Sequence, residues 1–93
     1  MTPATARAVL RIAAGLPHPS EAHATFCEAL GDKAPDRITK MRTFVAGVSQ
    51  KFGVSLERVW GDVIENAGKR NPETLVYVLA ALHEAQLEGE VAP

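Results

Sequence analysis

The sequence predicts an all-α fold, a compact bundle of about five short helices that forms a single domain over residues 1–93. Fifteen of the 43 apolar residues are alanine and five residues are aromatic, a composition that favours helices over packed sheets. Apolar residues recur every three or four positions, and no alternating run indicates a β-strand. The length and the net charge of −1 exclude a two-domain enzyme and a strongly basic nucleic-acid coat.

Glycines divide the chain into helical segments. We expect helices near residues 3–14, 20–30, 35–52, 55–67 and 72–88. Each is expected to stop at a glycine, because glycine is the preferred left-handed residue after a helix end: Gly15, Gly31, Gly53, Gly68 and Gly89. The connections between the segments are short.

The helix starts carry their own signals. Thr2 and Asn71 each precede a proline and are expected to cap the first and last helices, because proline is preorganised for the first helical position. Ser20 and Ser55 are expected to cap the second and fourth helices. The third helix has Pro35 at its start but no good cap residue before it.

Each predicted helix has one apolar face. In chain order these faces consist of Val9, Ile12, Ala13 and Leu16; Ala22, Phe26, Ala29 and Leu30; Ile38, Met41, Val45, Val48 and Phe52; Leu56, Trp60, Val63, Ile64 and Ala67; and Leu75, Val78, Leu79, Leu82 and Ala85. Arg7 and Arg11 lie opposite the first face, and Phe44 lies beside the third.

The last helix is apolar over an unusually wide arc. Val76, His83 and Leu87 extend its apolar face to roughly 220°, whereas a surface helix needs about 100°. Two interpretations follow. This helix is either the central helix of the bundle, or these three residues form an interface with a partner, most simply in a homodimer.

No enzyme signature is present in the sequence. It contains no Ser-His-Asp motif, no glycine-rich phosphate loop and no HExxH zinc motif. His23 and Cys27 are four residues apart and could share a metal, but only His18 and His83 could add further nitrogen ligands. Packing of Cys27 as a small apolar residue is the simpler interpretation. We therefore expect no enzymatic activity, no cofactor and no metal.

Residues 45–64 fit a helix-turn-helix pattern, with Gly53 at the turn and Ser49 as the small residue before it. Ser55 and Arg58 would then face DNA. The match weakens at Asp62, which takes the place of a packing residue, and the exposed side of this helix carries more acids than cations. Phosphate binding requires unpaired cations, so DNA binding is the alternative function.

A basic strip is the stronger candidate for binding. Gly47 and Gly61 lie on polar helix sides, where each costs about 1 kcal/mol relative to alanine. Gly47 shares a face with Lys40 and Lys51, which suggests a flat contact surface. Tolerated drift, or a neighbouring helix crossing there, would also explain these glycines. The predicted partner-binding surface consists of Arg7, Arg11, Lys40, Gly47 and Lys51.

Charge is unevenly distributed along the chain. Residues 1–52 carry a net charge of +3 and residues 53–93 a net charge of −4, which predicts a bipolar molecule that docks in one orientation. We expect a full-length, cytoplasmic protein-protein interaction or regulatory module, of the inhibitor or adaptor type, that occupies the surface of another protein. The single cysteine fits a reducing compartment, and no apolar run is long enough to span a membrane. No motif is specific enough to indicate a family.

Overall fold

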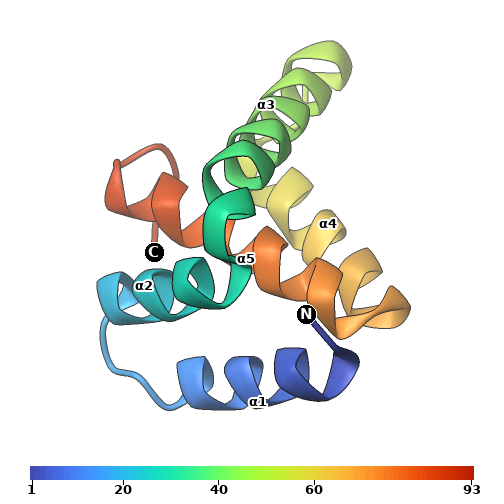
Figure 1. Cartoon of the computed structure of the whole chain (residues 1–93). Coiled ribbons are helices and arrows are strands. Elements are labelled where there is room, and N and C mark those ends of the chain that lie inside the picture. Colours follow the sequence, from blue (N-terminus) through green and yellow to red (C-terminus); the bar gives the residue numbers. More distant parts are fainter.

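The computed structural model describes all residues, 1–93, and confirms the all-α prediction (Figure 1). Its elements are α1 (Pro3–Ala14), α2 (Pro19–Leu30), the short 3₁₀ helix η1 (Gly31–Lys33), α3 (Ala34–Phe52), α4 (Leu56–Arg70) and α5 (Pro72–Leu87). Helix α5 contacts each of the other four α-helices, which pack around it. The central-helix interpretation of its wide apolar arc is therefore confirmed.

Three of the predicted N-caps are present. The side chain of Thr2 accepts a hydrogen bond from the backbone N–H of Thr5 at 3.1 Å. Ser55 caps α4 in the same way at 3.2 Å, and Asn71 caps α5 at 2.7 Å. Each bond satisfies one of the backbone donors that the first turn of a helix leaves free.

Two predicted boundaries are wrong. Helix α2 begins at Pro19 rather than after Ser20, because the fixed φ of proline suits the first helical position. Helix α4 continues through Gly68 to Arg70 and ends only at Asn71, whose extended backbone is favoured by the proline that follows it. One residue thus ends α4 and caps α5.

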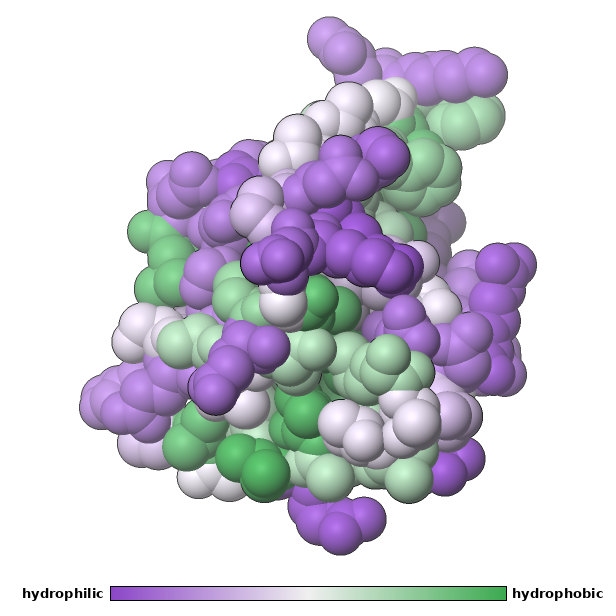
Figure 2. Space-filling model, viewed as in Figure 1, coloured by the Kyte–Doolittle hydropathy of each residue, from purple (hydrophilic) through white to green (hydrophobic).

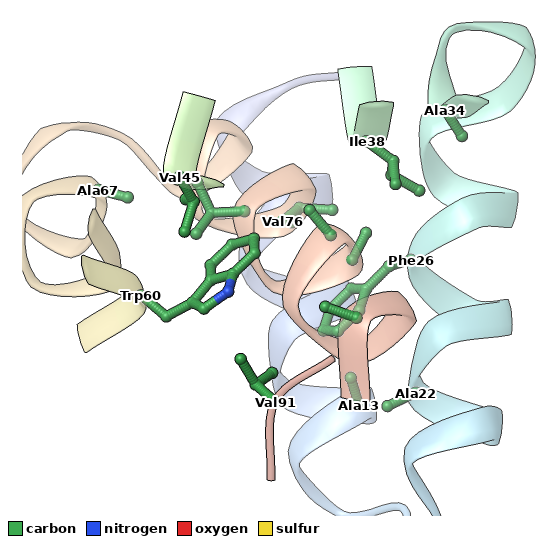
Figure 3. Close-up of a cluster of buried hydrophobic side chains, with 14 of the residues drawn as sticks. Ala13, Ala22, Phe26, Ala34, Ile38, Val45, Trp60, Ala67, Val76 and Val91 are labelled. Carbon is green, nitrogen blue, oxygen red and sulfur yellow. The ribbon is translucent and has the colours of Figure 1, made fainter. Parts of the chain in front are cut away.

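The core is alanine-rich and entirely apolar. Val76 and Val78 are fully buried and lie on opposite sides of α5, and alanines between them let neighbouring helices approach closely. Figure 3 shows Phe26 of α2 on one side of α5, and Trp60 with Val91 of the C-terminal tail on the other. Trp60 contributes the one buried side-chain polar atom without a partner, its indole N–H.

Some residues of the predicted apolar faces are exposed. Ile12, Phe44 and Phe52 retain 59%, 56% and 66% of their surface. Helix α1 packs only on α2 and α5 and turns Ala6 and Ala13 inward, so Ile12 faces away. The C-terminal half of α3 projects beyond the body of the bundle, which leaves Phe52 uncovered at its end (Figure 1).

The residues of the predicted homodimer interface have different environments. Val76 is fully buried within its own chain and offers no surface to a second copy. The ring of His83 is half-buried and stacks on Phe26, with centroids 5.7 Å apart. Leu87 is exposed at the end of α5. The wide arc of α5 is covered by the helices of the same chain at Val76, and the three residues do not form one open surface.

Gly47→Ala is expected to stabilise the domain by about 0.5–1 kcal/mol, because alanine restricts the unfolded chain and favours the helix. No atom lies within 4 Å of a Cβ built there, so no neighbouring helix crosses at this point. Thermal unfolding should show a Tm increase of about 2–8 °C. Gly53→Ala is the control and should lower the Tm, since Gly53 has a φ of +64°. A lower Tm for Gly47→Ala would contradict this account.

Candidate interaction surface

His23 and Cys27 of α2 meet Glu84 of α5, but their geometry does not suit catalysis. The Sγ atom of Cys27 lies 3.5 Å from Nε2 of His23 and 4.0 Å from Nδ1. The same Nε2 lies 3.6 Å from a carboxylate oxygen of Glu84. A thiol–imidazole–acid relay uses one ring nitrogen for the thiol and the other for the acid. Here one nitrogen contacts both partners, so this arrangement provides no such relay.

The histidines and Cys27 do not gather around a metal position. No group of three or more His, Cys, Asp or Glu side chains is placed to hold a metal ion. His18 and His83 instead line a cavity of about 290 Å³ between α1, α2 and α5. His18 therefore does not reach back to the pair on α2, as a shared site would require.

Cys27 is expected to react slowly with iodoacetamide. Partial burial raises the pKa of its thiol, and the nearby carboxylate of Glu84 raises it further. Because the thiolate is the reactive form, alkylation at pH 8 should be several-fold slower than for a free cysteine. Glu84→Gln should accelerate it, measured by mass spectrometry over time. Alkylation as fast as that of unfolded protein would contradict the assigned environment.

Arg42 gathers the acidic end of the chain. Its guanidinium pairs with Glu84 at 3.0 Å, with Glu90 at 2.6 Å and with Glu88. The hydrogen bond from Glu90 is the largest cause that raises the pKa of Arg42 above its usual value, against the opposing effect of partial burial. The predicted bipolar charge is thereby reduced, because an N-terminal cation neutralises C-terminal acids. Sequence order alone gave no sign of this contact.

The predicted basic strip does not form one surface. Arg7 and Arg11 lie on α1, while Lys40, Gly47 and Lys51 lie on α3. These two helices make no contact and lie at opposite ends of the molecule in Figure 1. The prediction grouped residues by charge, and the interposed helices α2 and α5 separate the two groups. The three residues of α3 do lie on one side of that helix.

Two exposed aromatic residues lie beside the α3 part of the strip. Phe44 and Phe52 are the aromatic members of the five large apolar residues that remain exposed. We call the surface around them the α3–α4 face; its residues are Met41, Phe44, Val48, Phe52, Val54, Val59 and Val63. Apolar surface is visible along the flank of the projecting end of α3 in Figure 2. The position of Phe44 beside the apolar stripe was the available sequence signal.

Phe44 is shared by three adjacent cavities. One, of about 290 Å³, lies between α3 and α4 and reaches Phe52. The second, of about 230 Å³, includes Met41 and Tyr77. The third, of about 310 Å³, extends past Ala67 between α4 and α5. The side chain of Phe44 thus stands between three recesses with largely apolar walls.

The charges around the α3–α4 face are mostly positive. Four cations line its cavities: Arg37, Lys40, Arg58 and Arg70. Asp62 is the one acid among the lining residues. Arg58 and Arg70 have no ion-pair partner within the chain, and Lys51 lies over the ring of Phe52 at 5.5 Å. An apolar surface with a cationic border favours an apolar partner with acidic edges.

The turn of the predicted helix-turn-helix is present between α3 and α4. Gly53 adopts the left-handed conformation that ends α3, and the hydroxyl of Ser49 donates to the carbonyl of Val54. Ser55 and Arg58 are exposed at the start of α4. The acids on the exposed side of α4 are Glu57, Asp62 and Glu65, of which Glu65 pairs with Lys69.

Comparison with known proteins finds no relative: no family model, no curated protein and no solved structure matches the chain. No helix of the structure combines the length and the apolar character needed to cross a membrane.

Proposed function

We propose that the chain is a small, non-catalytic protein-protein interaction module of the inhibitor or adaptor type, which acts in the cytoplasm by occupying a partner surface through its α3–α4 face. The exposure of Phe44 and Phe52 on one helix is the observation that carries this proposal. Aromatic anchors contribute a large share of binding energy when a partner buries them. The cations around them add orientation.

The backbone of α3 is accessible beside the aromatic residues. Gly47 follows Phe44 by three residues, and nothing lies within 4 Å of the position that its Cβ would take. A partner can therefore approach this part of the helix more closely than a side chain would allow. The cost of a glycine within a helix supports an interaction role for the position.

Affinity capture from lysate of the source cells, with matched variants, tests the proposal. Phe44→Asp should reduce recovery of the specific partner at least about 30-fold, the equivalent of a hot-spot loss of about 2 kcal/mol. Ile12→Asp is the matched control, because Ile12 is an equally exposed apolar residue on the distant helix α1. Circular dichroism should show both variants folded. A partner that is lost with Ile12→Asp but retained with Phe44→Asp would disprove this assignment.

Helix-turn-helix DNA binding is the alternative, supported by the left-handed turn at Gly53 and by the exposure of Ser55 and Arg58. The acids on the exposed side of α4 speak against it, because they repel phosphate. A DNA-binding chain would shift a duplex at low salt, with affinity that falls steeply as salt rises and falls again with Arg58→Ala. We expect no shift of any duplex at low salt.

A further inference from the structure

Resting on the proposed function, we infer that the segment which occupies the α3–α4 face is an amphipathic helix with acidic residues along the edges of its apolar side. Three features support this: the recesses around Phe44, the absence of a sheet edge, and the charges at the border.

The recesses require several apolar groups from one partner segment. Phe44 separates a cavity that reaches Phe52 from two cavities that include Met41 and Tyr77. A ligand must therefore place apolar side chains on both sides of the Phe44 ring. Apolar residues at positions i, i+3 or i+4, and i+7 of a helix lie in a row and meet this requirement.

An extended segment fits this surface less well. Extended peptides gain affinity by pairing their backbone with a sheet edge, and this fold contains no strand. Against the apolar walls formed by Val48, Val59 and Val63, an extended backbone would lose water without gaining hydrogen bonds. A helix satisfies its own backbone groups and presents only side chains to the groove.

The charges select acidic edges on that helix. Arg58 borders the cavity that reaches Phe52, and Arg70 borders the cavity beyond Ala67. Neither has an ion-pair partner within the chain. Acidic residues on either side of the partner's apolar row would lie beside these cations. Basic residues in those positions would be repelled, which gives specificity as well as affinity.

A second copy of the chain is a poorer occupant. Symmetric packing through the α3–α4 face would bring Lys51 and Arg58 toward the same cations of the other copy. The acidic end of the chain is also occupied, because its glutamates converge on Arg42. The charges of the chain therefore favour a different protein.

Selection from an unbiased library tests the inference. Random peptides of about 16 residues, roughly four helical turns, are displayed on phage and selected on the wild-type chain, with counter-selection on Phe44→Ala. Enriched peptides should show helical apolar periodicity with more Asp and Glu than Lys and Arg. Measured by fluorescence anisotropy, Phe44→Ala should weaken the best peptide at least about 10-fold. Arg58→Glu should also weaken it, and Ile12→Ala should leave it unchanged.

Each other outcome overturns a defined part of the inference. Enriched peptides that are basic overturn the acidic edges, and peptides without helical periodicity overturn the helix. If no peptide binds while cellular capture still depends on Phe44, the proposed function stands and this inference fails. A dimer that is seen by light scattering and is lost with Phe44→Ala would assign the face to a second copy. If neither capture nor peptide binding depends on Phe44, both the function and the inference are wrong.

Discussion

Replacing Val76 with aspartate is expected to unfold the domain. Val76 is fully buried on α5, the helix that contacts all the others, and its neighbours are apolar. An ionised carboxylate there would lose its hydration without gaining a partner, which costs about 3–5 kcal/mol when a buried charge is left uncompensated. A domain of this length has a total stability of about 5–14 kcal/mol, so the loss removes much of it.

Circular dichroism with thermal unfolding measures this effect. The Tm should fall by at least about 15 °C, or the helical signal should be absent at room temperature. Leu87→Asp is the matched control, because Leu87 lies on the same helix but is exposed; it should change the Tm by only a few degrees. A Val76→Asp protein with wild-type Tm and altered association would instead support a role for Val76 in an interface between chains.

Replacing Arg42 with alanine is expected to cost about 2–3 kcal/mol. The change leaves Glu84, Glu88 and Glu90 close together without their shared cation, and it removes charged hydrogen bonds on a side chain that is only 20% exposed. It should also loosen the C-terminal tail, which Glu90 ties to α3 and which places Val91 in the core. Figure 3 shows Val91 beside Trp60.

Two measurements separate these consequences of Arg42→Ala. The Tm should fall by about 8–20 °C, and hydrogen exchange of residues 88–93 should accelerate under conditions where α2 remains protected. Lys40→Ala is the control, because its ion pair with Asp36 is exposed and contributes about 0.5 kcal/mol or less. Added Glu90→Gln should restore part of the stability by lowering the repulsion. An unchanged Tm and an unchanged exchange rate for Arg42→Ala would contradict the assigned ion-pair cluster.

Local signals predicted most of the helices and their caps. Thr2, Ser55 and Asn71 act on backbone groups within three residues, so their effect is readable from adjacent sequence. Gly68 misled the analysis of α4, since glycine within a helix costs only about 1 kcal/mol and packing can offset it. The extended backbone imposed before Pro72 proved to be the stronger signal.

Long-range contacts explain what could not be predicted. Periodicity identified an apolar side of α3, but whether another element covers Phe44 and Phe52 depends on where the remaining helices pack. Arg42 meets acids that are 42 to 48 residues away, and no local pattern selects it from the other arginines. Likewise, the separation of Arg7 from Lys40 follows from the position of α5 between their helices.

Site-specific photo-crosslinking tests the assignment of the α3–α4 face most directly. A photoreactive phenylalanine analogue at position 44, and in a separate protein at position 12, is activated in lysate of the source cells, and the adducts are measured by mass spectrometry. We expect one partner protein attached at position 44, through a segment that forms an acidic amphipathic helix, and no specific adduct at position 12. A specific adduct at position 12 with none at position 44 would contradict the assignment.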